Sequence, residues 1–256
     1  MGYFAILLIY ISDVSDYTAC MSIKKLLFHI LIFQIIASGF LILIMFFNEL
    51  THFRALGFTG LWYMLDLRIE TNLATWAEST MMAITALPCY ILLTYNGKTE
   101  FKKSTQLFFG AALILALFFS ADEILQLHEL IGFKLQDITH FGEGTFLQGF
   151  SWVIYYLPFM LIGLTWTSFV VIDLWKKISS DIKKRVLILV GVLSLSIIAV
   201  ILLEVTEAYL YTRNFSSDLS TIFEESFELV VICSFYGLLY LFYSELTKND
   251  DFSSWN

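Results

Sequence analysis

Acidic side chains inside apolar segments are the residues of this chain most able to do chemistry. Asp122, Glu204 and Glu228 each lie within a stretch of about 20 or more largely apolar residues, long enough to cross a bilayer. An ionised carboxylate near the middle of a bilayer costs on the order of 2.5–3.5 kcal/mol even on insertion scales. These side chains must therefore face the interior of a helix bundle, water, a cation or one another.

Helical spacing predicts that these acids share faces. Asp122 is joined to Glu129 through Gln126 by steps of four and three residues, which lie on one side of a helix. Glu204 and Glu207 are three residues apart and share a second face.

The last apolar segment repeats the pattern. Glu224 and Glu225 reach Glu228 by steps of four and three residues. With Glu78 in the second apolar segment included, acids of four predicted spans lie at a similar depth, on the order of 8–13 Å inside the same end of the bundle.

Carboxylates with an imidazole are the ligands of a divalent cation. Oxygen ligands suit calcium, magnesium or manganese, and a mixed oxygen–nitrogen set can hold iron or zinc, so the identity of the metal stays open. A ferritin-type di-iron site is disfavoured because its Glu-x-x-His pairs are absent. The predicted metal ligands are Asp66, Glu70, Glu78, His128, Glu129, Glu204, Glu207, Glu225 and Glu228, with Asp122 and Glu123 as candidate catalytic carboxylates.

Two other interpretations of the acids stay open at this point. Acids in the first turn of a helix favour its dipole, which accounts for part of Glu224 and Glu225. Acids at loosely packed helix ends would also pair with the basic residues of their side, which are Arg54, Arg68, Lys134 and Arg213. A transport or sensor protein would instead bind protons or cations there, although the inner halves of the predicted spans are almost purely apolar.

Transmembrane helices are the elements that must position these residues. The chain has 256 residues, of which 58% are hydrophobic and only 15% charged, whereas a soluble domain is nearer a quarter charged. The net charge of −8 without a basic stripe excludes a nucleic-acid partner, so membrane lipid is the expected partner. The predicted fold is all-α, a polytopic transmembrane helical bundle with six spans at 26–47, 73–95, 106–130, 150–175, 186–211 and 219–243.

The organisation predicted from these spans has three parts. An N-terminal segment covers 1–25, the six-span domain covers 26–245, and a polar tail covers 246–256. Met21 precedes two lysines and a long apolar run, as the start of a signal-anchor would, so we expect Met21 to be the true start.

Basic residues predict the orientation, because short cytoplasmic loops are enriched in Lys and Arg. Of the 15 basic residues, four fall on one side, namely the four named above, and the rest fall on the other. Both termini are therefore expected in the cytoplasm of a multi-pass protein of the cell membrane, with the acids in the outer half of the bilayer.

Motifs in three of the spans resemble those of a known group. Asp66 precedes Glu70-Thr71-Asn72-Leu73 and Trp76, Asp122-Glu123 precedes His128-Glu129, and the last span contains Phe227-Glu228. These motifs resemble a widespread group of uncharacterised bacterial multipass membrane proteins. The resemblance covers most of spans two to six and implies the bacterial inner membrane, but it brings no established activity.

A fainter similarity is to alkaline ceramidases and their relatives, membrane hydrolases that bind calcium beside a zinc site. It implies a calcium set of Asp66, Glu70, Asn72 and Glu78, with Ser120 and His128 as distant counterparts of the family's serine and first zinc histidine. The family's closing His-x-x-x-His pair is absent, and six spans replace seven. The similarity therefore supports an acidic metal site rather than zinc amidase chemistry.

The function expected from the sequence is a membrane-embedded divalent-metal protein, with a lipid-directed hydrolase as its enzymatic form. A metal in the outer leaflet would polarise a carbonyl and lower the pKa of bound water, and Asp122 or Glu123 would act as the base. A proton- or cation-linked transporter and a non-catalytic structural subunit are the alternatives.

Overall fold

The computed structural model describes residues 17–51, 64, 72–94, 102–140, 144–145, 152–176, 178–213 and 218–246. Every long element in these ranges is an α-helix. The helices are α2 (Tyr17–Thr51), α4 (Leu73–Thr94), α5 (Lys103–Leu125), α6 (Leu127–Thr139), α7 (Trp152–Trp175), α8 (Ser180–Thr212) and α9 (Asp218–Leu246). The predicted spans overlap α2, α4, α5, α7, α8 and α9, and the third of them also reaches into α6. Asp66 and Glu70 fall outside the described ranges.

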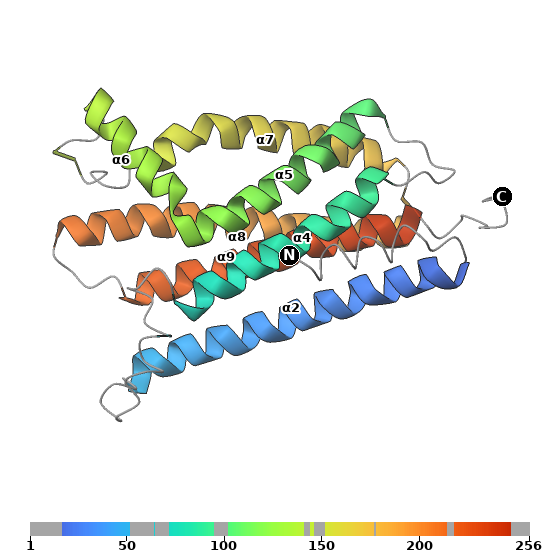
Figure 1. Cartoon of the computed structure of the whole chain (residues 1–256), viewed down its shortest axis with the longest axis horizontal. Coiled ribbons are helices and arrows are strands. Elements are labelled where there is room, and N and C mark those ends of the chain that lie inside the picture. Colours follow the sequence, from blue (N-terminus) through green and yellow to red (C-terminus); the bar gives the residue numbers. More distant parts are fainter. Residues whose placement is uncertain are drawn as a thin grey trace.

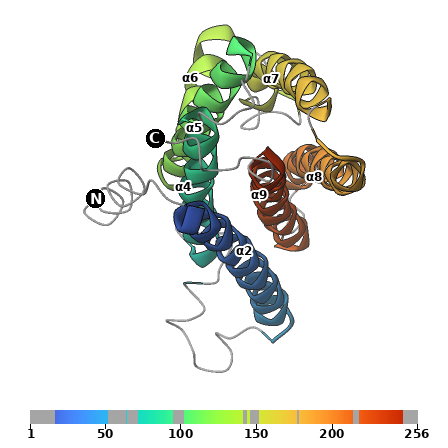
Figure 2. The same cartoon turned by 90° about the vertical axis from the view of Figure 1, so that its right-hand side faces the viewer.

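The long helices lie side by side and alternate in direction (Figure 1). α9 packs against α2, α4 and α8, while α4 also packs against α5, and α5 against α7. Seen from the end of the bundle, α9 lies between α8 on one side and α2 and α4 on the other (Figure 2). Lys24 Nζ donates to the Ser244 carbonyl at 3.4 Å, so the beginning of α2 lies beside the end of α9.

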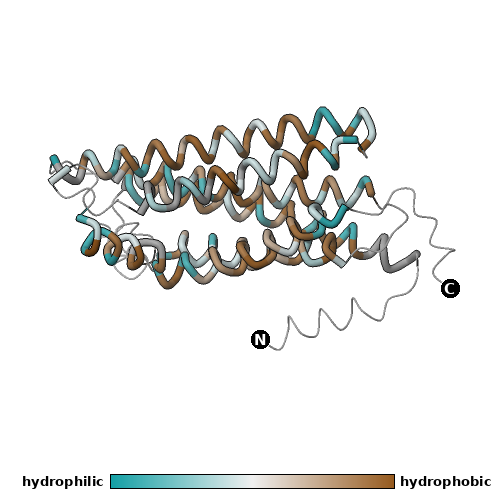
Figure 3. The backbone as a smooth tube through the Cα atoms, turned by 90° about the horizontal axis from the view of Figure 1, so that it is seen from above, coloured by the Kyte–Doolittle hydropathy of each residue, from teal (hydrophilic) through white to brown (hydrophobic). Residues whose placement is uncertain are grey.

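Apolar composition continues along the length of the long helices (Figure 3). Within the described residues, α2, α4, α5, α8 and α9 contain stretches long and apolar enough to cross a membrane, and α7 contributes a shorter one at Leu161–Trp175. Large apolar side chains such as Leu195 and Leu202 on α8 are more than half exposed. Exposed apolar faces of this extent suit contact with lipid tails.

The two ends of the bundle differ in their interiors. The largest apolar core fills the half where α2 begins and α9 ends; its members include Leu27, Leu87, Phe109, Leu174 and Tyr236. Among the described residues, the other half, where α4 begins and α5 ends, contains two small clusters of buried apolar residues. We call this second half the acidic half, because the acids of α4, α5, α8 and α9 lie there.

The third predicted span ends earlier than expected. Gln126 adopts a left-handed conformation with φ 53°, and its N–H donates to the Asp122 carbonyl at 2.6 Å, which ends α5 at Leu125. The chain then starts the shorter helix α6. The prediction of one continuous helix to residue 130, with Glu129 on the same face as Asp122, is therefore wrong, because a left-handed residue redirects the chain.

Candidate metal centre

Helix α4 begins at a defined cap that sets the position of Glu78. Asn72 precedes the helix, and its Oδ1 accepts a hydrogen bond from the Thr75 N–H at 3.0 Å. A side-chain oxygen at this position satisfies one of the N–H groups that a helix start leaves unpaired. Glu78 follows in the second turn and lies in the helix contacted by both α5 and α9.

A pair of serines holds α4 against α5. Ser79 Oγ donates to the Ser120 carbonyl at 2.6 Å and lies 3.2 Å from Ser120 Oγ. Ser79 neighbours Glu78 in sequence, and Ser120 is three residues before Glu123, on the same side of α5. This contact fixes the register in which Glu78 and Glu123 approach each other.

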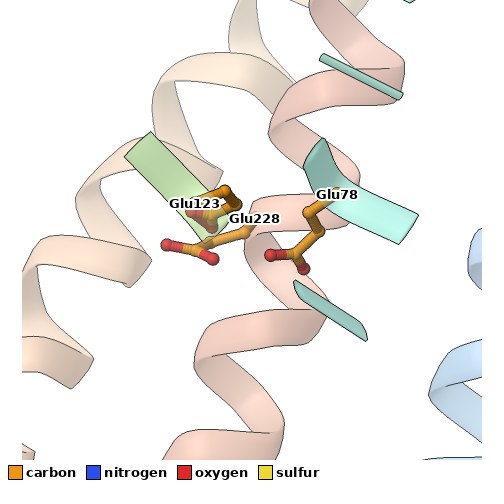
Figure 4. Close-up of side chains that lie close together, drawn as sticks. All are labelled: Glu78, Glu123 and Glu228. Carbon is orange, nitrogen blue, oxygen red and sulfur yellow. The ribbon is translucent and has the colours of Figure 1, made fainter. Parts of the chain in front are cut away.

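Glu78, Glu123 and Glu228 form a three-glutamate cluster. They come from α4, α5 and α9, and each offers a carboxylate oxygen that lies within 4.8 Å of the other two (Figure 4). Ligands on opposite sides of a Ca²⁺ ion at 2.3–2.6 Å are about 4.6–5.2 Å apart. The oxygens are therefore close enough to bind one cation together.

Glu78 is the most deeply buried member of the cluster. Its side chain is 1% exposed, and neither carboxylate oxygen has a hydrogen-bond partner among the described residues. Its polar neighbours are the carboxyl groups of Glu225 and Glu228, which accept hydrogen bonds but donate only when protonated. A buried polar group without a partner is rare in proteins and calls for a ligand, water or proton to satisfy it.

Basic residues do not supply the missing partner in the part of the chain described. The charges that act most strongly on Glu78, Glu225 and Glu228 come from other glutamates. Arg213 lies over the ring of Tyr209, with Cζ 5.5 Å from the centroid, and Lys134 is exposed on α6. Arg54 and Arg68 lie outside the described residues.

The helix dipole accounts for little of the acidity on α9. The helix begins at Asp218, so Glu224 and Glu225 lie beyond its first turn. The favourable effect of the dipole falls off within that turn. The interpretation of these two acids as residues of the first turn is therefore wrong.

Four of the other eight predicted site residues, Asp122, Glu204, Glu207 and Glu225, have described side chains in the acidic half. Asp122 is 5% exposed near the end of α5, and Glu225 is half-buried beside Glu78. Glu204 and Glu207 are half-buried on α8, where Glu207 Oε1 accepts a hydrogen bond from Thr221 Oγ1 at 3.2 Å.

Other predicted residues are placed less fully. His128 and Glu129 belong to the first turn of α6, and their side chains lie outside what the structure describes. Glu123, predicted as a candidate catalytic carboxylate and not as a metal ligand, offers an oxygen to the cluster. Sequence spacing could not predict this, because spacing relates residues of one helix, whereas Glu78, Glu123 and Glu228 lie on three different helices.

A protein-family model described as a domain of unknown function, DUF8692, matches residues 29–242, which is more than half of the chain. No curated protein and no solved structure matches the chain.

Proposed function

The chain belongs to the DUF8692 family, and we propose that it is an integral membrane protein that binds a divalent cation through Glu78, Glu123 and Glu228. The observation that carries the proposal is Glu78. Its carboxylate is 1% exposed and has no hydrogen-bond partner among the residues that the structure describes, so it needs a positive charge or a proton. A cation between the three carboxylates would satisfy all of them at once.

The donor set favours a hard cation. The three described ligands are all carboxylates, and the group contains neither a thiol nor an imidazole. Calcium, magnesium and manganese prefer such oxygen ligands, whereas zinc sites usually contain nitrogen or sulfur. We therefore propose one of these three ions rather than zinc, which also removes the basis for zinc amidase chemistry.

Lipid hydrolysis is the enzymatic form of this proposal. Glu123 and Glu228 are less buried than Glu78, so the cluster has a more open side on α5 and α9. On the orientation predicted from the basic residues, that side belongs to the outer leaflet, where ester and amide groups of lipids lie. A bound divalent cation supplies Lewis acidity at such a group. Asp122, which directly precedes Glu123 in the sequence, is the candidate base.

Transport through the bundle is the weaker alternative. The half away from the cluster is filled by the large apolar core around Leu27, Leu87 and Tyr236, all of which are 3% exposed or less. A pathway for protons or ions requires polar groups or water along its length. The apolar core therefore argues against a route across the membrane.

Elemental analysis of the full chain, purified in detergent, tests the proposal. We expect calcium, magnesium or manganese in stoichiometric amount, and at least a tenfold lower content in the variants Glu78→Gln and Glu228→Gln. Each substitution keeps the size of the side chain and removes its charge. Second-sphere contacts of metal sites alone change affinity by about 10–100-fold, so the loss of a direct ligand should exceed this.

The matched control is Glu49→Gln. Glu49 is a half-buried glutamate in the last turn of α2, and it is not a member of the cluster. Its substitution should leave the metal content unchanged. A wild-type protein that is folded and free of divalent metal, even after incubation with these ions, would refute the proposal.

A further inference from the structure

The two halves of the bundle hold their helices together in different ways. The largest apolar core, in the half where α2 begins and α9 ends, contains buried residues of all six long helices, such as Phe109 of α5 and Val186 of α8. Among the described residues, the two small apolar clusters of the acidic half are built by α2, α4 and α9. The position of α5 in the acidic half therefore depends on other contacts.

Polar side chains connect the end of α5 to its neighbours. Ser120 forms the hydrogen-bonded pair with Ser79 of α4, and one turn further along α5 a carboxylate oxygen of Glu123 lies within 4.8 Å of those of Glu78 and Glu228. Within the described ranges α5 packs against α4, α6 and α7, whereas α9 packs against α2, α4 and α8. Glu123 and Glu228 thus connect two helices that are not a closely packed pair.

The sign of this connection depends on what lies between the carboxylates. Ionised carboxylates at this separation repel one another, and repulsion is stronger in a bundle interior than in water. A divalent cation that binds all three reverses the effect, because each carboxylate is then attracted to the same ion. The contact between α5 and α9 is therefore unfavourable without the cation and favourable with it.

α5 is the helix of the cluster that is most free to respond. Glu78 is buried in α4, and α4 and α9 are joined in the acidic half by apolar contacts that include Met81 with Leu229 and Ile232. The end of α5 lies beyond its serine contact with α4 and continues through the left-handed Gln126 directly into α6. A change in the position of this end would therefore displace α6 as well.

We infer that the cation of the proposed function, on which this inference rests, controls the position of α5 relative to α9. With the cation bound, Glu123 is drawn towards Glu78 and Glu228, and the acidic half is closed. Without the cation, the end of α5 moves away from α9 about the Ser79–Ser120 contact. A ligand shifts an equilibrium of this kind when it binds one state better, and the closed state is the one that brings the three ligands together.

Distances between spin labels on α5 and α8 test the inference, because α8 packs against α9 and follows its position. The labelled sites are exposed leucines that have been replaced by cysteine, in a protein whose three native cysteines are replaced by alanine. Each leucine is 57–61% exposed, and the pairs are Leu125 with Leu202 in the acidic half and Leu107 with Leu187 in the other half.

The full chain in detergent is measured by pulsed electron paramagnetic resonance in EDTA and with the diamagnetic ions Ca²⁺ and Mg²⁺ in turn. We expect the Leu125–Leu202 label distance to be longer in EDTA, by more than the roughly 1–2 Å of a small helix shift. The Leu107–Leu187 distance should stay the same. Elemental analysis of the same samples measures the bound ion.

Glu123→Gln separates repulsion from a general effect of the cation on stability. The amide carries no charge and can donate a hydrogen bond to a neighbouring carboxylate. In EDTA this variant should therefore keep the short Leu125–Leu202 distance of the cation-bound wild type. Glu49→Gln is the matched control, and it should lengthen in EDTA as the wild type does.

The possible outcomes separate this inference from the proposed function. A stoichiometric bound ion with an unchanged Leu125–Leu202 distance overturns the inference and leaves the cation site in place. An equal change in the Leu107–Leu187 distance, or a Glu123→Gln variant that opens in EDTA as far as the wild type, also overturns it. A protein that is folded by circular dichroism and gel filtration and binds none of calcium, magnesium and manganese overturns both.

Discussion

Glu78 is a glutamate with almost no exposed surface, and in the described part of the chain neither of its oxygens has a hydrogen-bond partner. Such a residue lowers the stability of the protein without a ligand, because its charge is neither hydrated nor paired. The same residue raises the stability of the cation-bound protein, since binding to the folded state alone stabilises that state. Its two effects have opposite signs, and that makes Glu78 a sensitive probe of the site.

At this scale we predict the effect of Glu78→Gln on thermal unfolding in detergent. In EDTA the variant should be at least as stable as the wild type, and up to about 1–3 kcal/mol more stable, because an unsatisfied buried carboxylate is removed. With a cation at a hundred times its dissociation constant, the wild type should gain about 2.7 kcal/mol and the variant nothing. A cation effect of the same size in both proteins would place the ion elsewhere.

Acids inside apolar segments are easy to recognise in the sequence, whereas the acids that meet across helices are not. Glu78 and Glu228 were predicted as ligands and the structure brings them together, because an acid inside an apolar helix has to face the bundle interior. Glu123 was assigned a different role. Whether a side chain on one helix meets one on another depends on the rotation and register of both helices, and one chain does not reveal these.

Polar contacts between neighbouring helices help to hold the cluster in register. Between α4 and α5 these contacts are made by Ser79 and Ser120, one turn or less from the glutamates. Small hydroxyl residues allow close helix packing within a membrane and add an interhelical hydrogen bond. The position of the cluster therefore depends on residues that contribute no ligand.

Substitution of Ser79 tests this dependence. Ser79→Ala should lower the stability by about 1 kcal/mol, the value of a typical hydrogen bond, and should weaken cation binding measured by calorimetry. Thr80→Ala is the control, because Thr80 is exposed and its Oγ1 donates only within α4, to the Trp76 carbonyl at 2.8 Å. Equal effects of the two substitutions would contradict the role of Ser79 in positioning Glu78.

Existence and approximate extent of the helices were predictable, whereas their breaks were not. The six apolar segments all fall on helices, and five of these helices are long and apolar enough to cross a membrane, where a helix satisfies its own backbone. The left-handed residue at Gln126 carries no such signal, since neither Gly nor Pro marks it. As a result, the prediction that Asp122 and Glu129 share one face of a helix was wrong.

The whole molecule is polarised along its long axis. Lysines gather where α2, α5 and α8 begin, together with the largest apolar core, and most of the described glutamates lie in the other half. Lys102 forms an ion pair with Asp173 at 2.7 Å in the lysine-rich half. The positive-inside rule predicts that this half faces the cytoplasm.

Two matched substitutions test this orientation. Asp137 on α6 and Asp181 on α8 are both exposed, and they lie in the acidic and the lysine-rich halves respectively. A membrane-impermeant maleimide added to intact cells should label Asp137→Cys well above the wild-type background and should leave Asp181→Cys at that background. Permeabilised cells should show labelling of both. The reverse pattern would put the acidic half in the cytoplasm.

The order of the helices along the chain has a consequence for biogenesis. Glu78 and Glu123 enter the membrane with α4 and α5, but Glu228 follows 228 − 123 = 105 residues after Glu123. At a synthesis rate of 5–20 residues per second, roughly 5–20 s pass before the ribosome makes it. During that interval the nascent protein holds carboxylates in the bilayer without their final neighbour. A chain that stalls before α9 would therefore present the translocon and membrane proteases with an incomplete, charge-bearing intermediate.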